Sequence, residues 1–121
     1  REYFEKAAEL GNSDALLNLG RLYFEGKGIE QDYTKAKEYF EKAAELGNPY
    51  ALLNLGVLYT GDHGVEQDYT KAREYFEKAA EFGISEALRN LGVLYENGYG
   101  VEPDCIKAKE YFEKAGKHAD E

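Results

Sequence analysis

A repeat of 36 residues is the feature that most constrains how this 121-residue chain can fold. The segment Asn18-Leu19-Gly20 returns at residues 54–56 and again at residues 90–92, with no insertion between the copies. Self-similarity at a period of about 20 to 50 residues is typical of stacked units, because each unit is too small to bury its apolar surface alone. The chain is therefore predicted to be a linear array of repeated units.

Each unit carries the pattern of two helices. The first is expected over residues 13–25, where a rotation of about 100° per residue places the core stripe on one face: Ala15, Leu16, Leu19, Leu22 and Tyr23. The second is expected over residues 32–46, with the stripe Tyr33, Ala36, Tyr39, Phe40, Ala43, Ala44 and Leu46. Residues 1–10 match a second helix alone, so the chain is predicted to be all-α with seven helices in antiparallel pairs.

Capping residues mark the expected helix ends. Asn48 can cap a helix through its side chain, and Pro49 after it suits the first helical position. The hydroxyl of Ser85 is expected to cap the equivalent helix of the next unit. Asp32 is expected to cap the second helix of its unit, and Gly47 to end that helix in a left-handed conformation.

Small residues are expected where the two helices of a unit cross. Gly20 and Ala36 would lie on facing helices and allow a short distance between the helix axes. A bulky side chain at Gly20 or at its copy Gly56 is therefore predicted to overpack the crossing.

The charge of the chain excludes some classes of partner. Its formal net charge is −9 at pH 7, and such an acidic surface repels nucleic-acid phosphates and anionic lipid headgroups. No apolar run reaches the roughly 18 residues that a membrane span requires. Neither nucleic acid nor membrane is an expected partner, whereas a basic protein segment would be attracted.

The residue types that carry catalysis or bind metals do not form a recognisable set. Cys105 is the only cysteine, so no intrachain disulfide or cysteine metal site is expected, and its side chain is predicted to be buried. His63 and His118 do not form a His-x-x-x-His pair. The chain is predicted not to be an enzyme and to need no metal or cofactor. The lone cysteine and the lack of a signal-peptide pattern leave the compartment open, with a lean towards an intracellular one.

The motifs of the unit resemble those of a known family. The unit reads Ala-x-x-x-Asn-Leu-Gly-x-x-Tyr, then Gly-x-Gly-Val/Ile, Asp, Lys-Ala, Tyr-Phe-x-Lys-Ala-Ala and Gly. It resembles the Sel1-like repeat, a relative of the tetratricopeptide repeat. The resemblance covers the chain as a second helix of a truncated repeat at 1–12 and three repeats at 13–48, 49–84 and 85–121. It implies a right-handed α–α superhelix, of a kind that mostly serves as an adaptor or scaffold in protein complexes.

The first helices of the units carry the candidate binding surface, since in superhelices of this kind they line the concave face. Positions off the core stripe differ between units, while the core positions stay nearly constant. Such variation is typical of a tailored groove, although neutral drift on a surface produces it as well. The candidate residues for binding a peptide or protein are Asp14, Leu17, Asn18, Arg21, Phe24, Tyr50, Leu53, Asn54, Val57, Glu86, Arg89, Asn90 and Val93.

Asn18 and its copies Asn54 and Asn90 have two interpretations. A row of amides along a groove can hold an extended peptide through its backbone, as the resemblance to tetratricopeptide grooves implies. Alternatively, each asparagine bonds a neighbouring helix and belongs to the architecture of the repeat. Conservation of the residue between the units is consistent with both.

Two functions remain open from the sequence. One is an adaptor that binds a peptide or protein segment on the concave face. The other is a structural spacer, or a chain engineered from a repeat consensus, without a ligand of its own. The N-terminus has the pattern of a cut through a longer array and the C-terminus that of a real end. End-to-end self-association through the exposed N-terminal helix is therefore a further expectation.

Overall fold

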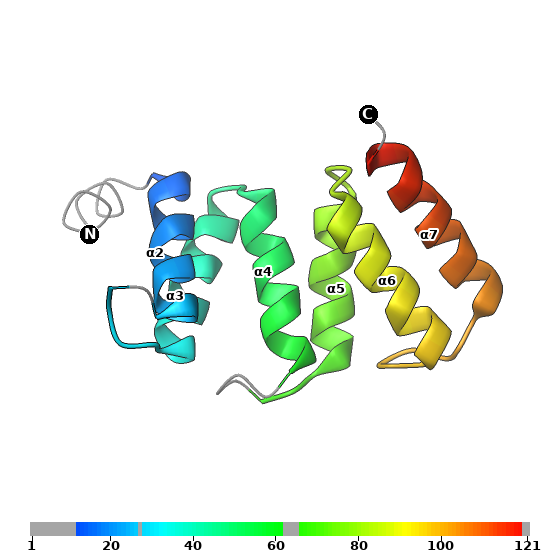
Figure 1. The fold of residues 1–121 in the computed structure, drawn as a ribbon, viewed down its shortest axis with the longest axis horizontal. Helices are drawn as coiled ribbons and strands as arrows, with labels where there is room; N and C mark the ends of the chain where they lie inside the picture. The colour runs from blue at the N-terminus through cyan, green and yellow to red at the C-terminus, as the bar shows by residue number, and fades with distance from the viewer. Residues whose placement is uncertain (1–11, 27, 62–65, 120–121) are drawn as a thin grey trace.

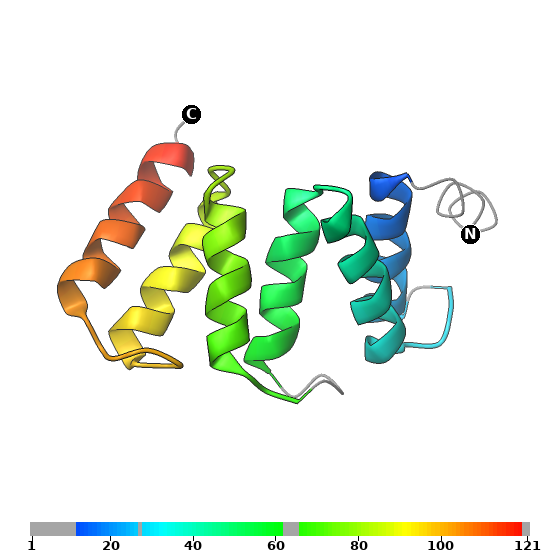
Figure 2. The ribbon, with the colours of Figure 1, turned by 180° about the vertical axis from the view of Figure 1, so that it is seen from behind.

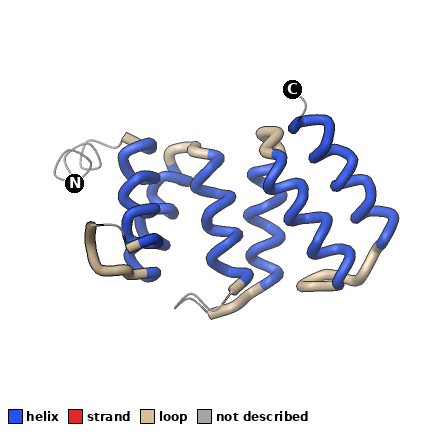
Figure 3. The backbone as a smooth tube through the Cα atoms, in the orientation of Figure 1, coloured by secondary structure: helices blue, strands red, loops and turns tan. Residues whose placement is uncertain are grey.

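The computed structural model describes residues 12–26, 28–61 and 66–119, and these residues form six α-helices (Figure 1). The helices are α2 (Ser13–Glu25), α3 (Tyr33–Glu45), α4 (Pro49–Thr60), α5 (Tyr69–Ala80), α6 (Ser85–Asn97) and α7 (Cys105–Ala119). Figure 3 shows the described part of the chain as helices joined by loops, without strands. The helix expected over residues 1–10 lies outside the described residues.

The helices are stacked in chain order along the long axis of the molecule (Figures 1 and 2). Each packs mainly on its neighbours in the sequence. The interfaces within the pairs α2–α3, α4–α5 and α6–α7 are more extensive than those that join one pair to the next. This nearest-neighbour packing is that of a helical solenoid. The all-α repeat architecture expected from the sequence is confirmed.

The core runs through the array as two apolar clusters that meet at α4. One contains residues of α2, α3 and α4, and the other residues of α4, α5 and α6. Leu19 and its copies Leu55 and Leu91 are fully buried, as the helical periodicity predicts. Five residues of the expected core stripes are not fully buried: Leu22, Tyr33, Tyr39 and Ala44 are half-buried, and Leu46 is 53% exposed. Leu46 lies just beyond the end of α3, where the chain has left the helical path that would keep it on the apolar face.

An aromatic ring covers each glycine at the helix crossings. A Cβ atom added to Gly20 would lie 2.5 Å from Cε1 of Phe40, and the same distance separates a Cβ on Gly56 from Cε1 of Phe76. The residue that uses the space over Gly20 is thus a phenylalanine, and not the small Ala36 that the sequence suggested. Only glycine leaves room for the ring, since protein interiors contain few voids.

The helix ends confirm most of the predicted caps. The side chain of Asn48 accepts hydrogen bonds from the backbone N–H groups of Tyr50 and Ala51, and Asp32 accepts one from Lys35. Gly47 has a left-handed φ of 87°. The prediction for Ser85 is wrong, because Ile84 occupies the capping position and makes no side-chain bond, so that α6 begins without a polar cap.

The prediction that Cys105 is buried is also wrong, since the residue is exposed at the first position of α7. Its copies Tyr33 and Tyr69 are half-buried at the equivalent positions of α3 and α5. Within the described residues, no further helix packs against the outer side of α7. A residue type that is usually buried is therefore left at the surface of this helix.

A stacked pair of tyrosines links the two helices of each unit. The ring centroids lie 5.7 Å apart in the pair Tyr23–Tyr39, 5.9 Å in Tyr59–Tyr75 and 5.6 Å in Tyr95–Tyr111. A lysine ammonium lies over each ring, 5.1 to 5.8 Å from its centroid, and these residues are Lys35, Lys42, Lys71, Lys78, Lys107 and Lys114. The lysines thus stabilise the helix pairs by cation–π contacts instead of only solvating the surface.

The free energy of unfolding is expected to decrease at alkaline pH because of the partly buried tyrosine pairs. Burial, with the neighbouring Tyr59, raises the pKa of Tyr75 above its ordinary value of 10.0. Because the unfolded chain then loses this proton at a lower pH than the folded chain, the contribution to stability is present below about pH 10 and is lost as the pH rises through the folded pKa. Urea unfolding at pH 8 and pH 11 should therefore show a smaller decrease in unfolding free energy for Tyr75→Phe than for the parent chain. Tyr50→Phe, at an exposed tyrosine, is the matched control and should behave as the parent chain does.

Candidate functional site

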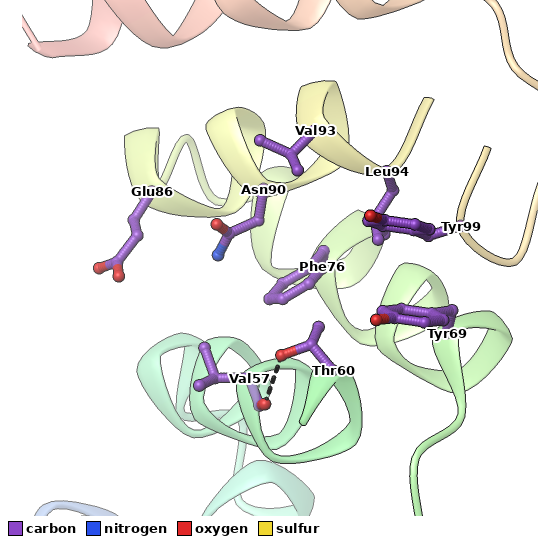
Figure 4. A pocket seen from close by; sticks show the side chains of 9 residues that line it. All are labelled: Val57, Thr60, Tyr69, Phe76, Glu86, Asn90, Val93, Leu94 and Tyr99. Carbon is purple, nitrogen blue, oxygen red and sulfur yellow. Dashed lines mark hydrogen bonds between the residues drawn. The ribbon is translucent and has the colours of Figure 1, made fainter. Parts of the chain in front are cut away.

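The candidate site is a cavity of about 380 Å³ between α4 and α6 (Figure 4). Its walls come from α4, from α5, from α6 and from the loop that follows α6. The lining residues are Val57, Thr60, Tyr69, Phe76, Glu86, Asn90, Val93, Leu94 and Tyr99. The cavity thus joins the repeat that contains α4 and α5 to the next one.

A small residue at position 60 explains why the cavity exists. Thr60 stands where the first unit has Phe24, whose ring packs edge-on against Tyr33 with 5.4 Å between the ring centroids. The hydroxyl of Thr60 donates to the backbone oxygen of Val57 over 2.7 Å, so the side chain turns back onto its own helix (Figure 4). The volume that an aromatic ring would fill at this position is left open.

A stacked tyrosine pair forms one end of the cavity. The rings of Tyr69 and Tyr99 lie 4.7 Å apart between centroids, at an interplanar angle of 17°. Gly100 makes this stacking possible, because a Cβ atom there would lie 2.6 Å from the backbone carbon of Tyr69, and its φ of 69° is left-handed. The loop after α6 therefore reaches back to the start of α5 and brings Tyr99 onto Tyr69.

Five of the nine side chains that line the cavity carry a polar group, and one of these, the hydroxyl of Thr60, is bonded to its own helix. Figure 4 shows the amide of Asn90 pointing from α6 into the space above Val57, with the carboxylate of Glu86 at the end away from the tyrosines. Nearby on α4, the amide nitrogen of Asn54 is buried and has no hydrogen-bond partner among the described residues. Since most buried polar groups in proteins are paired, this donor is an exception. The arrangement combines an apolar, aromatic wall with a small number of polar groups, as in many binding sites.

The structure brings four of the thirteen predicted binding residues together in this cavity: Val57, Glu86, Asn90 and Val93. Arg21, Arg89 and Tyr50 are exposed outside it, and Asn18 is half-buried. Asp14 lies exposed at the start of α2, where its carboxylate accepts a hydrogen bond of 3.2 Å from the side chain of Asn48. Part of its role is thus to join the first unit to the second.

The apolar candidates on α2 and α4 correct the sequence interpretation. Leu17 and Leu53 are each only 6% exposed and belong to the two core clusters, so a ligand cannot use them as exposed anchors. Among the described helices, α4 contacts its partner α5 and also α3 of the preceding unit, and α6 contacts α7 and also α5. Such two-sided contact buries more of the circumference of a first helix than a single stripe. Phe24 is half-buried and packs against Tyr33.

The sequence interpretation missed the cavity residues that lie off the first helices. Tyr69 and Tyr99 come from the start of α5 and from the loop after α6. Thr60, at the end of α4, is the copy of the candidate residue Phe24, and the sequence shows that it breaks the match at this position of the repeat. The stacking of Tyr69 on Tyr99 joins residues 30 positions apart and leaves no periodic pattern.

Metal and membrane sites were searched in the described ranges. Within them, no group of three or more His, Cys, Asp or Glu side chains is placed to hold a metal ion. No described helix is long and apolar enough to cross a membrane. His63, which the sequence places in a loop, lies outside the described residues.

Comparisons with known proteins identify the family. The Sel1 repeat model matches residues 1–12, 13–48, 49–83 and 85–120. A Sel1 repeat protein from Oxalobacter formigenes is similar in structure, with a TM-score of 0.88 and 34% identity over 96% of this chain and 47% of that one. Protein c5321, a protective antigen present in uropathogenic Escherichia coli strains displaying an SLR fold, has a TM-score of 0.93 and 38% identity over 96% of this chain and 25% of its own.

A third similar structure is cysteine rich protein B of Helicobacter pylori, with a TM-score of 0.72 and 29% identity over 97% of this chain and 84% of that one. A search of curated protein sequences finds no match. The chain spans 47% and 25% of the lengths of the first two relatives, so it corresponds to a part of each. With matches along nearly its whole length, the chain belongs to the Sel1 repeat family, a helical-repeat fold that is generally non-catalytic and serves as a scaffold for protein interactions.

Proposed function

We propose that this chain is an interaction module that binds a segment of a protein partner on the face formed by α2, α4 and α6, with the cavity between α4 and α6 as its main contact. The position of the cavity carries the proposal. Val57, Glu86, Asn90 and Val93 line it, and all four belong to first helices. The repeats differ in sequence at the positions of Val57, Glu86 and Val93, whereas all three repeats have asparagine at the position of Asn90. In this proposal, repeats 49–84 and 85–121 act as the two units that form the site together.

The residues around the cavity support a protein partner. Exposed Tyr50 and Arg89 lie on α4 and α6, and Val93 is 41% exposed at the edge of the cavity. Tyrosine and arginine are enriched at protein interfaces because they offer a large contact area together with polar groups. A surface of this composition suits an extended segment that places one side chain in the cavity.

The asparagine row supports contact with a backbone. Asn90 presents its amide to the cavity, and Asn54 holds a buried N–H donor without a partner. A side-chain rotation of Asn54 on binding would allow a ligand carbonyl to accept from this donor and remove the cost of leaving it unpaired. The architectural interpretation instead requires a partner within the chain, and no described residue provides one for the Asn54 nitrogen.

The proposal is tested by selecting short random peptides on the immobilised chain and titrating a selected peptide into isotope-labelled protein. We expect the amide chemical-shift changes to cluster on α4 and α6 around the cavity. Val93→Glu should weaken binding about tenfold or more, as truncation or disruption of a central contact does in other interfaces.

Ile106→Glu is the matched control, since Ile106 is also an exposed aliphatic residue but lies on α7 outside the cavity. It should leave the affinity unchanged. The proposal would be contradicted if the chemical-shift changes were confined to α3, α5 or α7. It would also be contradicted if Val93→Glu bound the peptide with unchanged affinity. Failure to select any peptide would instead favour a structural spacer without a ligand of its own.

A further inference from the structure

We infer that the cavity between α4 and α6 accepts an arginine side chain of the partner segment. The inference rests on the proposed function, because it names the chemistry that the same cavity selects. It follows from the shape of the cavity, from the charge of the residues that line it and from the contacts of its aromatic rings.

The cavity has the shape that a long side chain requires. Figure 4 shows Glu86 at one end and the rings of Tyr69 and Tyr99 at the other, with Phe76 and Asn90 between them. Apolar surface from Val57 and Phe76 thus lies along the middle of the cavity. A methylene stem can bury itself on such a surface while it carries a polar head to the end.

The charge of the walls selects a cation. Glu86 is the one formally charged side chain among the described residues that line the cavity, and no lysine or arginine lines it. The chain as a whole has a formal net charge of −9 at pH 7. A basic segment is therefore attracted over a distance, whereas an acidic side chain in the cavity would lie close to the Glu86 carboxylate.

Among the residues that the structure describes, no lysine or arginine lies over the tyrosine rings at this site. In each of the three tyrosine pairs within the units, one lysine lies over each of the two rings. The described contacts of Tyr69 and Tyr99 include no such cation, although their rings are stacked in a similar way. The chain therefore uses cations on tyrosine faces repeatedly, and the stacked pair at the end of the cavity has none among the described residues.

Arginine fits these walls better than lysine does. Its planar guanidinium offers five N–H donors, which suit the Glu86 carboxylate and the carbonyl of Asn90 at the end of the cavity away from the tyrosines. Lysine has a compact ammonium with a stronger hydration shell and no planar face. A partner segment with an arginine is thus preferred to one with a lysine, and both are preferred to a neutral residue.

The site occurs at one register of the array. In the first unit, the residues equivalent to Val57 and Thr60 are Arg21 and Phe24. That register holds an aromatic ring and a cation of its own, and so cannot offer the same pocket to an arginine. The preference is therefore expected to depend on residues of the second and third units only.

The test uses short random peptides whose central residue is fixed as arginine, lysine, citrulline or leucine. Citrulline has the shape and the stem of arginine but no charge. The immobilised chain should retain the arginine peptides about three- to tenfold more than the citrulline peptides at low salt, and the ratio should fall as salt is added. In the Glu86→Gln variant, the ratio of retained arginine peptides to retained citrulline peptides should fall towards one.

Glu38→Gln is the matched control, because Glu38 is exposed on α3, lies outside the cavity, and changes the net charge equally. The Glu38→Gln variant should retain arginine peptides over citrulline peptides by the same ratio as the parent chain. Thr60→Phe, which restores the ring found in the first unit, should reduce retention of all four peptide sets, with a thermal melt to verify folding.

Equal retention of arginine and citrulline peptides by the parent chain, or the same ratio in Glu86→Gln, would overturn the inference. If those peptides still depend on Val93 and Thr60, the proposed binding site stands and only its selectivity is wrong. If no peptide set is retained, or retention is insensitive to Val93→Glu, both the site and its selectivity are wrong.

Discussion

A Gly56→Leu variant is expected to lose about 1–3 kcal/mol of unfolding free energy through overpacking of the crossing between α4 and α5. A Cβ atom at this position would already lie 2.5 Å from Cε1 of Phe76. Phe76 is 1% exposed, so its ring cannot move without displacing other core residues. Alanine should also destabilise the chain here, although it is the better helix former by about 1 kcal/mol. Urea unfolding of the variants measures both changes.

Gly116→Leu is the matched control for this prediction. Gly116 lies in α7, is exposed, and has no atom within 4 Å of an added Cβ. Leucine at this position removes only the poor helix propensity of glycine, so the stability should be unchanged or slightly increased. Equal losses at Gly56 and Gly116 would show that the close contact with Phe76 is wrong.

A Leu55→Ala variant is expected to lose about 2–5 kcal/mol of unfolding free energy. Leu55 is fully buried in α4 and belongs to the cluster that joins α2, α3 and α4. Its removal leaves a cavity at the junction between two units, where the stability of a repeat array depends on contacts between neighbours. Thermal or urea unfolding should show the loss directly.

Leu46→Ala is the control for the loss of a leucine side chain without the loss of packing. Leu46 is 53% exposed just after α3, and surface substitutions of this kind usually change stability by less than about 0.5 kcal/mol. A loss at Leu46 similar to that at Leu55 would mean that the first core cluster extends beyond the end of α3.

The local elements of the fold were predictable from the sequence. The helix expected over residues 13–25 is α2 (Ser13–Glu25), and the one expected over 32–46 is α3 (Tyr33–Glu45). Helical periodicity and capping residues are properties of neighbouring positions in the chain, so they can be recognised in the sequence without knowledge of tertiary contacts. The cap of α6 failed for a local reason, since Ile84 occupies the position that Asn48 holds in the preceding unit.

Burial around a first helix was harder to predict than its core stripe. Leu17 and Leu53 lie off the stripe and are nevertheless buried, whereas Leu46 lies on a stripe and is exposed. Each depends on which other element covers it, and a helix in a solenoid is covered from two directions. The periodic pattern of apolar residues indicates only the more extensive of the two helix–helix contacts.

The sequence alone determined the repeat, the family, the helices and the face on which the units differ. The tertiary structure decided where that face opens into a cavity. Thr60, Tyr69 and Tyr99 come from three separate segments, and the cavity depends on the hydroxyl of Thr60 turning onto α4 and on Gly100 letting a loop approach α5. A cavity is a volume that no side chain fills, and only the packed positions of all the surrounding segments can show it.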